Sequence, residues 1–481
     1  MWRLLALCPC ALAHGGALER FPPEVSNVTS FVDNFDFANN ATFHQKALTY
    51  SAWWRAGNPI FFFFGGEGSV EGFYNASGAV FEHGQALEAM VVFLEHRYYG
   101  SSRPSSDLRF LTLEQALADT AWFLEGLRRR LGCGERECPV VTFGGSYGGM
   151  MVAWFRQKYP HLTAGGLASS APIDFYPNDG RQEAFWNATM HTFRFFGSEG
   201  CPGEVDKALG LLQQQSQDAA GRRQISEALG SCEDLENETT AGAKVDFFLR
   251  GVFATLAMLD YPVASNFVTL LPANPAKVAC QRLQSSTDLR GLRRVVDLFL
   301  NATGSYRCYD YLAEMVGRAT SGQLHGPTTL PDMGHWQYQA CNEMPMQSLT
   351  SDGMGFYPAK DSQLAEVADS CYLRYGLRPR TAWLGVSLGG SRLHVGQLLF
   401  TDGEKDPWRA GTPKASRIPS GVDIVQHLIP AAAHHEDLRF DASPPRAAVL
   451  EAKRLARRLV ARWAADFRRG GGSGAGGGWV V

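Results

Sequence analysis

The chain has no strong excess of charge of either sign and no long apolar run. Its 45 basic and 48 acidic side chains leave a net charge of −3, so no charge imbalance points to a nucleic acid or an anionic membrane as partner. No stretch reaches the ~18 uninterrupted apolar residues typical of a transmembrane helix. Internal repeats are absent, and the scattered cysteines do not have the spacing of zinc sites. A hydrophobic content of 45% over 481 residues instead predicts a globular protein of roughly two to three domains.

The N-terminus has the features of a secretory signal. Arg3 gives a basic start, Leu4 to Leu12 is mostly apolar, and Ala11-Leu12-Ala13 matches the small-x-small cleavage pattern. Residues 1–13 are therefore predicted to be a signal peptide. Six Asn-x-Ser/Thr sequons also fit a chain that passes through the secretory pathway, and they predict glycosylated surface loops. The sequons begin at Asn27, Asn40, Asn75, Asn187, Asn237 and Asn301.

The cysteine count also fits export. Two of the ten cysteines, Cys8 and Cys10, would leave with the signal peptide. The remaining eight form an even set, which in an exported chain suggests disulfides. Cys133 and Cys138 are close enough in sequence for a bridge within one loop, whereas spacing alone does not pair the others.

The middle of the chain separates two regions of alternating strand and helix patterns. Continuous apolar strands between helices predict a parallel sheet covered on both faces, and the region between reads as a largely helical insertion. The predicted organisation is an α/β domain in two parts, 25–173 and 379–468, a helical insertion over 174–378, and a Gly-rich tail over 469–481. The predicted strands are 60–64, 90–94, 139–143, 167–171, 396–400 and 422–429, and the predicted helices flanking them are 112–131, 150–158 and 446–466.

The strongest chemical signal is the run Gly144-Gly145-Ser146-Tyr147-Gly148-Gly149. It contains Gly-x-Ser-x-Gly and lies directly between a predicted strand and a predicted helix, as a nucleophile elbow requires. Side chains at Gly144 and Gly148 would clash across such a sharp turn. Ser146 is therefore the candidate nucleophile, and the backbone N–H of Tyr147 is the candidate donor to the developing oxyanion.

A serine hydroxyl needs a base and an orienting acid, which follow in the order Ser, Asp or Glu, His in this kind of fold. After a predicted strand the chain offers Asp402, Glu404 and Asp406, and after the last strand it offers His434 and His435. Spacing alone does not choose among these acids or between the two histidines.

A second oxyanion donor is expected from a loop after an early strand. Gly65-Gly66-Glu67-Gly68 is the candidate, with Gly66 as the donor, because glycines let the backbone approach a substrate.

Several longer motifs occur together and in order. They include Glu-His-Arg-Tyr-Tyr-Gly from Glu95 to Gly100, Asp-Tyr-Pro from Asp260 to Pro262, Leu-Pro-Ala-Asn-Pro from Leu271 to Pro275, Asp-Pro-Trp from Asp406 to Trp408 and Ala-His-His from Ala433 to His435. With the Gly-Gly-Ser-Tyr-Gly-Gly-Met run, they resemble the lysosomal Pro-X carboxypeptidase and dipeptidyl-peptidase II family of serine peptidases. The resemblance extends from about residue 32 to 463.

The resemblance implies an α/β-hydrolase fold with a helical cap, and cleavage after proline near one end of a peptide. It implies that Asp406 is the catalytic acid and His434 the catalytic base, with no metal and no cofactor. It also implies a lysosomal or extracellular location, peptide substrates and, as one option, a homodimer. A proline pocket would involve Met150, Met346 and Trp408, since apolar walls suit a pyrrolidine ring. The implied disulfides are Cys201–Cys280, Cys232–Cys308 and Cys341–Cys371.

The sequence departs from the family pattern at three places. Gly65-Gly66-Glu67-Gly68-Ser69 stands where Gly-Asn-Glu-Gly-Asp is usual, and Asp33-Asn34-Phe35 stands for Asp-His-Phe. Gln337 occupies the place of an Asp that, in the dipeptidyl-peptidase branch, can hold a substrate ammonium. Removal of N-terminal dipeptides is thus in question, with Glu67 as a candidate substitute carboxylate, and a Pro-X carboxypeptidase is the other branch. An esterase or lipase on the same fold is the alternative function.

Overall fold

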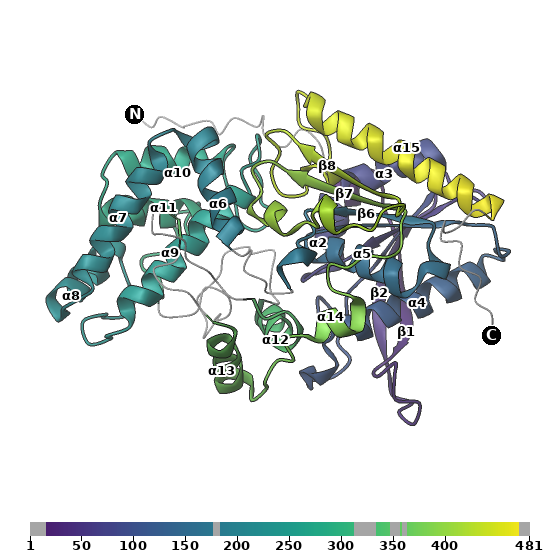
Figure 1. Cartoon of the computed structure of the whole chain (residues 1–481), viewed down its shortest axis with the longest axis horizontal. Helices are drawn as coiled ribbons and strands as arrows, with labels where there is room; N and C mark the ends of the chain where they lie inside the picture. The colour runs from purple at the N-terminus through teal and green to yellow at the C-terminus, as the bar shows by residue number, and fades with distance from the viewer. Residues whose placement is uncertain (1–15, 177–182, 312–332, 347–355, 358–362, 471–481) are drawn as a thin grey trace, which may run out of the picture.

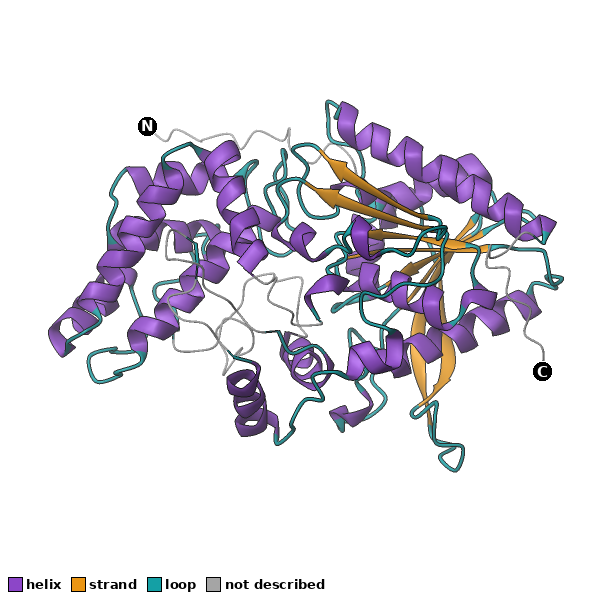
Figure 2. Cartoon of the chain, in the orientation of Figure 1, coloured by secondary structure: helices purple, strands orange, loops and turns teal. Residues whose placement is uncertain are grey.

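The computed structural model describes residues 16–176, 183–311, 333–346, 356–357 and 363–470 (Figure 1). Within these ranges the molecule has two lobes, one built on a single sheet and one built of helices (Figure 2). The predicted signal peptide and residues 471–481 of the predicted tail lie outside the described residues. The end predicted for the last helix was wrong, because α15 (Ala447–Arg469) continues three residues beyond it.

The sheet has eight strands in the order β1-β2-β4-β3-β5-β6-β7-β8. From β4 to β8 all neighbours are parallel, whereas β1 and β2 pair antiparallel and β2 joins β4 antiparallel. The sequence analysis identified no strand before residue 60. The edge strand β1 is mostly exposed, and β2 alternates between exposed and buried residues over its first half, so neither has the continuous apolar run of a central strand. The strands are β1 Glu24–Phe31, β2 Thr42–Tyr50, β3 Ile60–Phe64, β4 Met90–Leu94, β5 Val140–Gly145, β6 Gly165–Ser169, β7 Leu398–Gly403 and β8 Ile424–Ile429.

Helices cover both faces of this sheet. On one face α3 and α15 pack against alternate strand residues such as Phe61 and Phe63. On the other face α4 and α5 pack against Phe62 and Phe64. Burial on both faces explains why the central strands read as uninterrupted apolar runs. The helices of this lobe are α1 Ala17–Arg20, α2 Val70–Ala76, α3 Gly78–Leu87, α4 Leu113–Arg130, α5 Tyr147–Lys158, α14 Trp383–Leu388 and α15.

The chain between β6 and β7 is helical wherever it has regular structure among the described residues, and much of it has its own apolar core. Figure 1 shows the α6–α11 lobe beside the carboxyl ends of β7 and β8. This is the α/β-hydrolase fold with a helical insertion, which confirms the predicted fold class. The helices are α6 Glu183–Thr192, α7 Cys201–Gln215, α8 Ala219–Leu229, α9 Ala241–Met258, α10 Pro275–Gln284, α11 Leu289–Leu300, α12 Met333–Glu343 and α13 Leu364–Tyr375.

Four disulfides join the eight cysteines that follow the predicted signal peptide. One closes the short loop that leads into β5, and three lie in the insertion, where two of them span more than seventy residues. Closing long loops limits the unfolded chain most strongly. The pairs are Cys133–Cys138, Cys201–Cys280, Cys232–Cys308 and Cys341–Cys371, the same pairs that the loop spacing and the family resemblance suggested.

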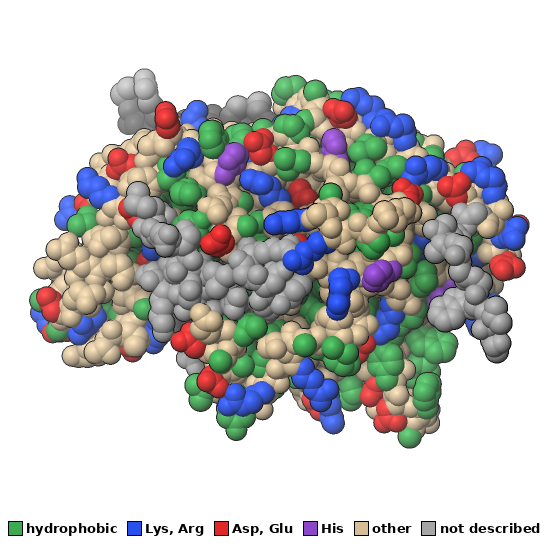
Figure 3. Space-filling view, viewed as in Figure 1, with side chains coloured by type: hydrophobic (Ala, Val, Ile, Leu, Met, Phe, Trp, Pro, Cys, Tyr) green, Lys and Arg blue, Asp and Glu red, His purple; other side chains and the backbone are tan. Residues whose placement is uncertain are grey.

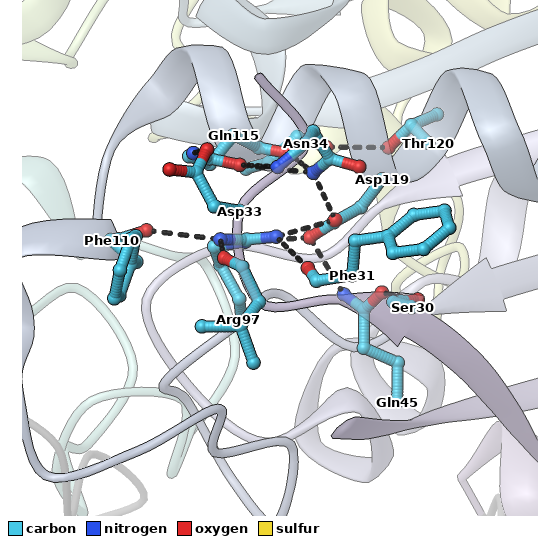
Figure 4. Close-up of polar contacts among 12 residues, drawn as sticks. Ser30, Phe31, Asp33, Asn34, Gln45, Arg97, Phe110, Gln115, Asp119 and Thr120 are labelled. Carbon is cyan, nitrogen blue, oxygen red and sulfur yellow. Dashed lines mark hydrogen bonds and ion pairs between the residues drawn. The ribbon is translucent and has the colours of Figure 1, made fainter. Parts of the chain in front are cut away.

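A buried polar cluster ties the edge strand β1 to the rest of the sheet lobe (Figure 4). The Arg97 guanidinium is fully buried and donates to both carboxylate oxygens of Asp119 on α4, at 2.7 and 2.6 Å. It also donates to the backbone oxygens of Phe31 and Val32. Asn34, one of the departures from the family pattern, donates to Asp119 at 2.8 Å. Asn34 therefore contributes to this cluster, which holds the end of β1 in place.

The surface carries both signs of charge, in keeping with the 45 basic and 48 acidic side chains of the chain. On the face shown in Figure 3, basic side chains gather along α15, which exposes Arg454, Arg458 and Arg462. In the described ranges, none of the helices combines the length and the apolar character needed to cross a membrane.

Candidate active site

Ser146 lies at the sharp turn between β5 and α5. Its backbone has φ 57° and ψ −125°, a conformation that a non-glycine residue adopts only when the surrounding structure imposes it. A Cβ at Gly144 would lie 2.3 Å from the Gly148 carbonyl oxygen, and one at Gly148 would lie 2.9 Å from the Phe64 oxygen. The clash predicted across the turn is therefore confirmed for Gly144, whereas a side chain at Gly148 would clash with the end of β3 instead. Tyr147 is the first residue of α5, so its N–H has no partner within the helix and lies next to Ser146.

The three candidate acids have three different partners. Asp402 accepts a hydrogen bond from Thr412 Oγ1 at 2.7 Å, and Glu404 accepts one from the backbone N–H of Ala431 at 2.8 Å. Asp406 Oδ2 lies 2.6 Å from Nδ1 of His434. Glu404 Oε1 also lies 3.3 Å from Nε2 of His191 on α6. Of the three carboxylates, Asp406 is therefore the one that the structure brings to a candidate catalytic histidine. It follows β7, so it lies at the carboxyl end of the sheet, as does the Ser146 elbow.

The two neighbouring histidines also have different environments. Both His434 and Asp406 are buried, and in the described part of the chain His434 Nε2 has no hydrogen-bond partner, which leaves this nitrogen available for a proton. The ring of His435 instead packs edge-on against Phe267, and its backbone N–H donates to Ser170 Oγ at 2.9 Å. Burial lowers the pKa of His435 well below the usual imidazole range, and the charge of His434 lowers it further. His434, rather than His435, therefore has the position of a base.

The loop after β3 contains the other proposed oxyanion donor. A Cβ at Gly66 would lie 2.8 Å from the ring of Phe73, so a side chain at this position would require that ring to shift. The neighbouring Glu67 is half-buried, and its carboxylate interacts electrostatically with His434, Tyr147 and Tyr176. Burial raises the pKa of Glu67, and the nearby His434 only partly opposes this. The Glu67 carboxyl therefore lies beside the candidate base in an environment that favours its protonated form.

The sequence analysis missed a buried network around the Tyr147 hydroxyl. Gln339 on α12 donates to it at 2.6 Å, and His96 Nε2 lies 3.0 Å from it. Both carboxylate oxygens of Glu343, one turn further along α12, share the Leu113 backbone N–H at the start of α4, at 2.8 and 2.7 Å. Burial raises the pKa of Glu343 to about 8. The residue after the nucleophile is thus fixed by contacts from the insertion, and the dispersed polar residues of α12 gave no sequence signal for this.

The candidate substrate-binding residues are spread over several elements. Met150 is buried on α5 in the same apolar cluster as Tyr147, whereas Met346 is half-buried after α12. Trp408 packs its ring against Phe185, with centroids 4.8 Å apart. Gln337 on α12 accepts a hydrogen bond from the hydroxyl of Tyr375 on α13 at 3.3 Å. The amide of Gln337 is therefore engaged within the insertion.

The predicted glycosylation sites lie mainly on the surface. Asn301 is half-buried, and its amide bonds to the backbone of Tyr306 through both its oxygen and its nitrogen. The other five asparagines are exposed, namely Asn27, Asn40, Asn75, Asn187 and Asn237.

Comparison with known proteins adds independent information. A family model described as serine carboxypeptidase S28 matches residues 30–455. The lysosomal Pro-X carboxypeptidase of Homo sapiens is 34% identical over 452 residues, which cover 91% of this chain and 87% of the relative. The prolyl carboxy peptidase like protein 5 of Caenorhabditis elegans is 29% identical over 465 residues, covering 91% and 89%. Among solved structures, the crystal structure of VinJ aligns over 92% of this chain and 100% of its own, with a TM-score of 0.40 at 11% identity.

Proposed function

Because the chain belongs to the serine carboxypeptidase S28 family, we propose that it removes the C-terminal residue from peptides whose penultimate residue is proline. The observation that carries this proposal is the buried 2.6 Å contact between His434 Nδ1 and Asp406 Oδ2, on loops at the edge of the sheet that also holds the Ser146 elbow. The family makes the chain a serine peptidase, and this contact supplies the base and acid that a serine nucleophile needs.

In the proposed mechanism, Ser146 Oγ attacks the carbonyl carbon of proline while His434 Nε2 takes the hydroxyl proton. Asp406 holds the tautomer and stabilises the imidazolium. The backbone N–H groups of Tyr147 and Gly66 donate to the oxyanion of the tetrahedral intermediate. His434 then gives its proton to the leaving amine, which departs as the free C-terminal amino acid. Water, deprotonated by His434, cleaves the Ser146 ester and releases the shortened peptide.

Recognition of proline is assigned to apolar walls. A pyrrolidine ring has no N–H to satisfy within a peptide, so Met150, Met346 and Trp408 suit it as neighbours. The carboxypeptidase branch is favoured over the dipeptidyl-peptidase branch because Gln337 has no charge to hold a substrate ammonium. The 34% identity to the lysosomal Pro-X carboxypeptidase of Homo sapiens favours the same branch.

A dipeptidyl-peptidase remains a second candidate because of one observation. Glu67 lies beside His434 without a hydrogen bond to another described residue, and an ionised carboxylate there would attract an ammonium. Burial raises the pKa of Glu67, however, and a protonated carboxyl holds a cation poorly. This environment therefore weighs against the second candidate.

We also assign the chain to the secretory pathway, with the lysosome or the cell exterior as its destination. The supporting features are the disulfides, which form in oxidising compartments, the exposed sequons and the lysosomal relatives. The predicted signal peptide at residues 1–13 would direct this route.

Mass spectrometry of Ala-Pro-Phe peptides with free and blocked ends tests the proposal. Release of Phe from N-acetylated peptide would support the carboxypeptidase. Release of Ala-Pro from C-amidated peptide, only when the N-terminus is free, would establish the dipeptidyl-peptidase. Cleavage of neither peptide by wild type, when a fluorophosphonate labels wild type but not the Ser146→Ala variant, would refute specificity for proline. Hydrolysis of long acyl esters in that case would favour an esterase.

A further inference from the structure

The Asp-Tyr-Pro motif at Asp260 to Pro262 has no role in the proposed chemistry, yet it follows α9 directly. We propose that residues 258–261, at the end of α9, are a positioning element that holds the catalytic base loop and the catalytic acid loop in register. Figure 1 shows the α6–α11 lobe beside the ends of β7 and β8, after which these two loops begin. This inference rests on the proposed triad.

The base loop is held through the backbone of His434. The His434 N–H donates to the Met258 carbonyl oxygen at 3.0 Å. The His434 carbonyl oxygen accepts from the hydroxyl of Tyr261 at 3.0 Å. Both Tyr261 and His434 are buried. The backbone N–H and carbonyl of His434 are thus both hydrogen-bonded to the helical insertion. The insertion therefore fixes the position of the imidazole.

The acid loop is held through Lys405, the residue before Asp406. The Lys405 ammonium lies 2.8 Å from Asp260 Oδ2 and donates to the Asp260 backbone oxygen at 3.0 Å. The side chains of this pair are 6% and 0% exposed, so each charge depends on the other. The Lys405 N–H donates at 2.9 Å to the carbonyl oxygen of Ala432, in the base loop.

The Asp260 carboxylate is itself held in place by a backbone hydrogen bond. Its Oδ1 accepts from the Ala276 backbone N–H at 2.9 Å, near the start of α10. Met258 adds a contact of its own to the acid loop, because its sulfur accepts from the indole N–H of Trp408 at 3.2 Å. Met258, Asp260 and Tyr261 therefore contact the two loops between them, Met258 both loops, Asp260 the acid loop and Tyr261 the base loop.

Loss of this element should slow the reaction more than it weakens substrate binding. A misplacement of about 1 Å in a catalytic group costs on the order of 100-fold in rate. Asp260 and Lys405 bind each other rather than substrate in this arrangement. Asp260→Asn and Lys405→Met are therefore expected to lower kcat by roughly 10- to 100-fold while KM stays within about threefold.

The experiment measures kcat and KM on the peptide that wild type cleaves, together with the rate at which a fluorophosphonate labels Ser146. The labelling rate measures the reactivity of Ser146 and does not depend on which peptides the protein cleaves. A wild type that is labelled but cleaves none of the peptides would therefore refute the proposed function and leave this inference open to test by the labelling rates. The matched control is Asp246→Asn, which breaks another buried ion pair, Asp246–Arg250, on the helix α9 that leads into Asp260. Each variant is assayed well below its own melting temperature.

Slower labelling in both single variants, with normal labelling in the control, would support the inference. The double variant should then lose no more than the worse single variant, because the two side chains act as one unit. If either single variant fails to fold, Tyr261→Phe removes only the hydroxyl bonded to His434 and should slow labelling by about 3- to 10-fold. Labelling at the wild-type rate in the folded variants, or an equal loss in Asp246→Asn, would overturn the inference.

Discussion

The acid loop offers a sharp test, because replacing either of two nearby carboxyls by an amide should have opposite outcomes. Asp402 and Asp406 are both buried, and the sequence alone did not choose between them. Burial raises the pKa of Asp402 to about 8, and the charges of Asp406 and Asp437 add to this effect. At about pH 5 the Asp402 carboxyl is therefore mostly protonated and neutral.

Asp402→Asn should consequently cost little at this pH. Asparagine matches the neutral carboxyl in shape and charge, and its amide oxygen can still accept the hydrogen bond from Thr412 Oγ1. We expect kcat/KM for the N-acetylated peptide to stay within about threefold of wild type. Above about pH 8 the comparison changes, since wild type then carries a second negative charge beside Asp406 and the variant does not.

Asp406→Asn should remove most of the activity. Its oxygen lies 2.6 Å from His434 Nδ1, and an amide there neither enforces the tautomer nor stabilises the imidazolium. Loss of this acid in a Ser-His-Asp triad costs ~10³- to 10⁴-fold in kcat, or ~4–5.5 kcal/mol of transition-state stabilisation.

The assay is kcat and KM at about pH 5, with the fluorophosphonate labelling rate as a second measure. Near-equal losses in the two variants, or a larger loss in Asp402→Asn, would refute the assignment of the acid. A normal melting temperature in both variants is needed for the comparison.

Three further predictions concern stability and the elbow. Glu343→Gln should flatten the pH dependence of the melting temperature, because the Glu343 pKa rises from 4.5 to about 8 on folding. The stability that this group contributes is present below about pH 4.5 and is lost as the pH rises to about 8. An unchanged slope of melting temperature against pH would contradict this. Gly144→Ala should abolish soluble, active protein, since the new Cβ would lie 2.3 Å from the Gly148 carbonyl oxygen. Its control is Gly210→Ala on α7, where a Cβ would have no atom within 4 Å. This control should leave the stability in thermal unfolding unchanged or raise it by up to ~1 kcal/mol. Arg97→Met should lower the free energy of unfolding by ~3–5 kcal/mol, because it leaves the buried Asp119 carboxylate without its ion pair. Arg109→Met, which breaks an exposed ion pair, should lower it by at most ~1 kcal/mol. Equal losses in denaturant unfolding would refute the role of the cluster in Figure 4.

Local patterns were enough to predict the centre of the fold. Burial on both faces of the sheet requires uninterrupted apolar strands, so Ile60–Phe64 and Met90–Leu94 were predicted with the bounds that the structure has. The edge strand β1 and its neighbour β2 were missed because β1 is mostly exposed and β2 is only partly buried, so neither has such a run. The end of α15 was predicted three residues too early, since its last turn depends on packing that the sequence does not display.

The sequence by itself determined the nucleophile elbow and the order of the candidate catalytic groups. A strand, two glycines around Ser146 and a helix are local features, and the backbone geometry they require is local too. Only the tertiary structure decided which acid meets which histidine, because Asp402, Glu404 and Asp406 lie within five residues of one another and differ only in their distant partners.

The tertiary structure alone also linked the insertion to the candidate catalytic loops. Asp260 and Lys405 are more than one hundred residues apart, and neither the period of a helix nor a short motif records such a pairing. Buried charges must find partners wherever the fold brings them together. The candidate catalytic residues could therefore be predicted from residues adjacent in the sequence. The contacts that hold their loops in place depend on how the two lobes pack.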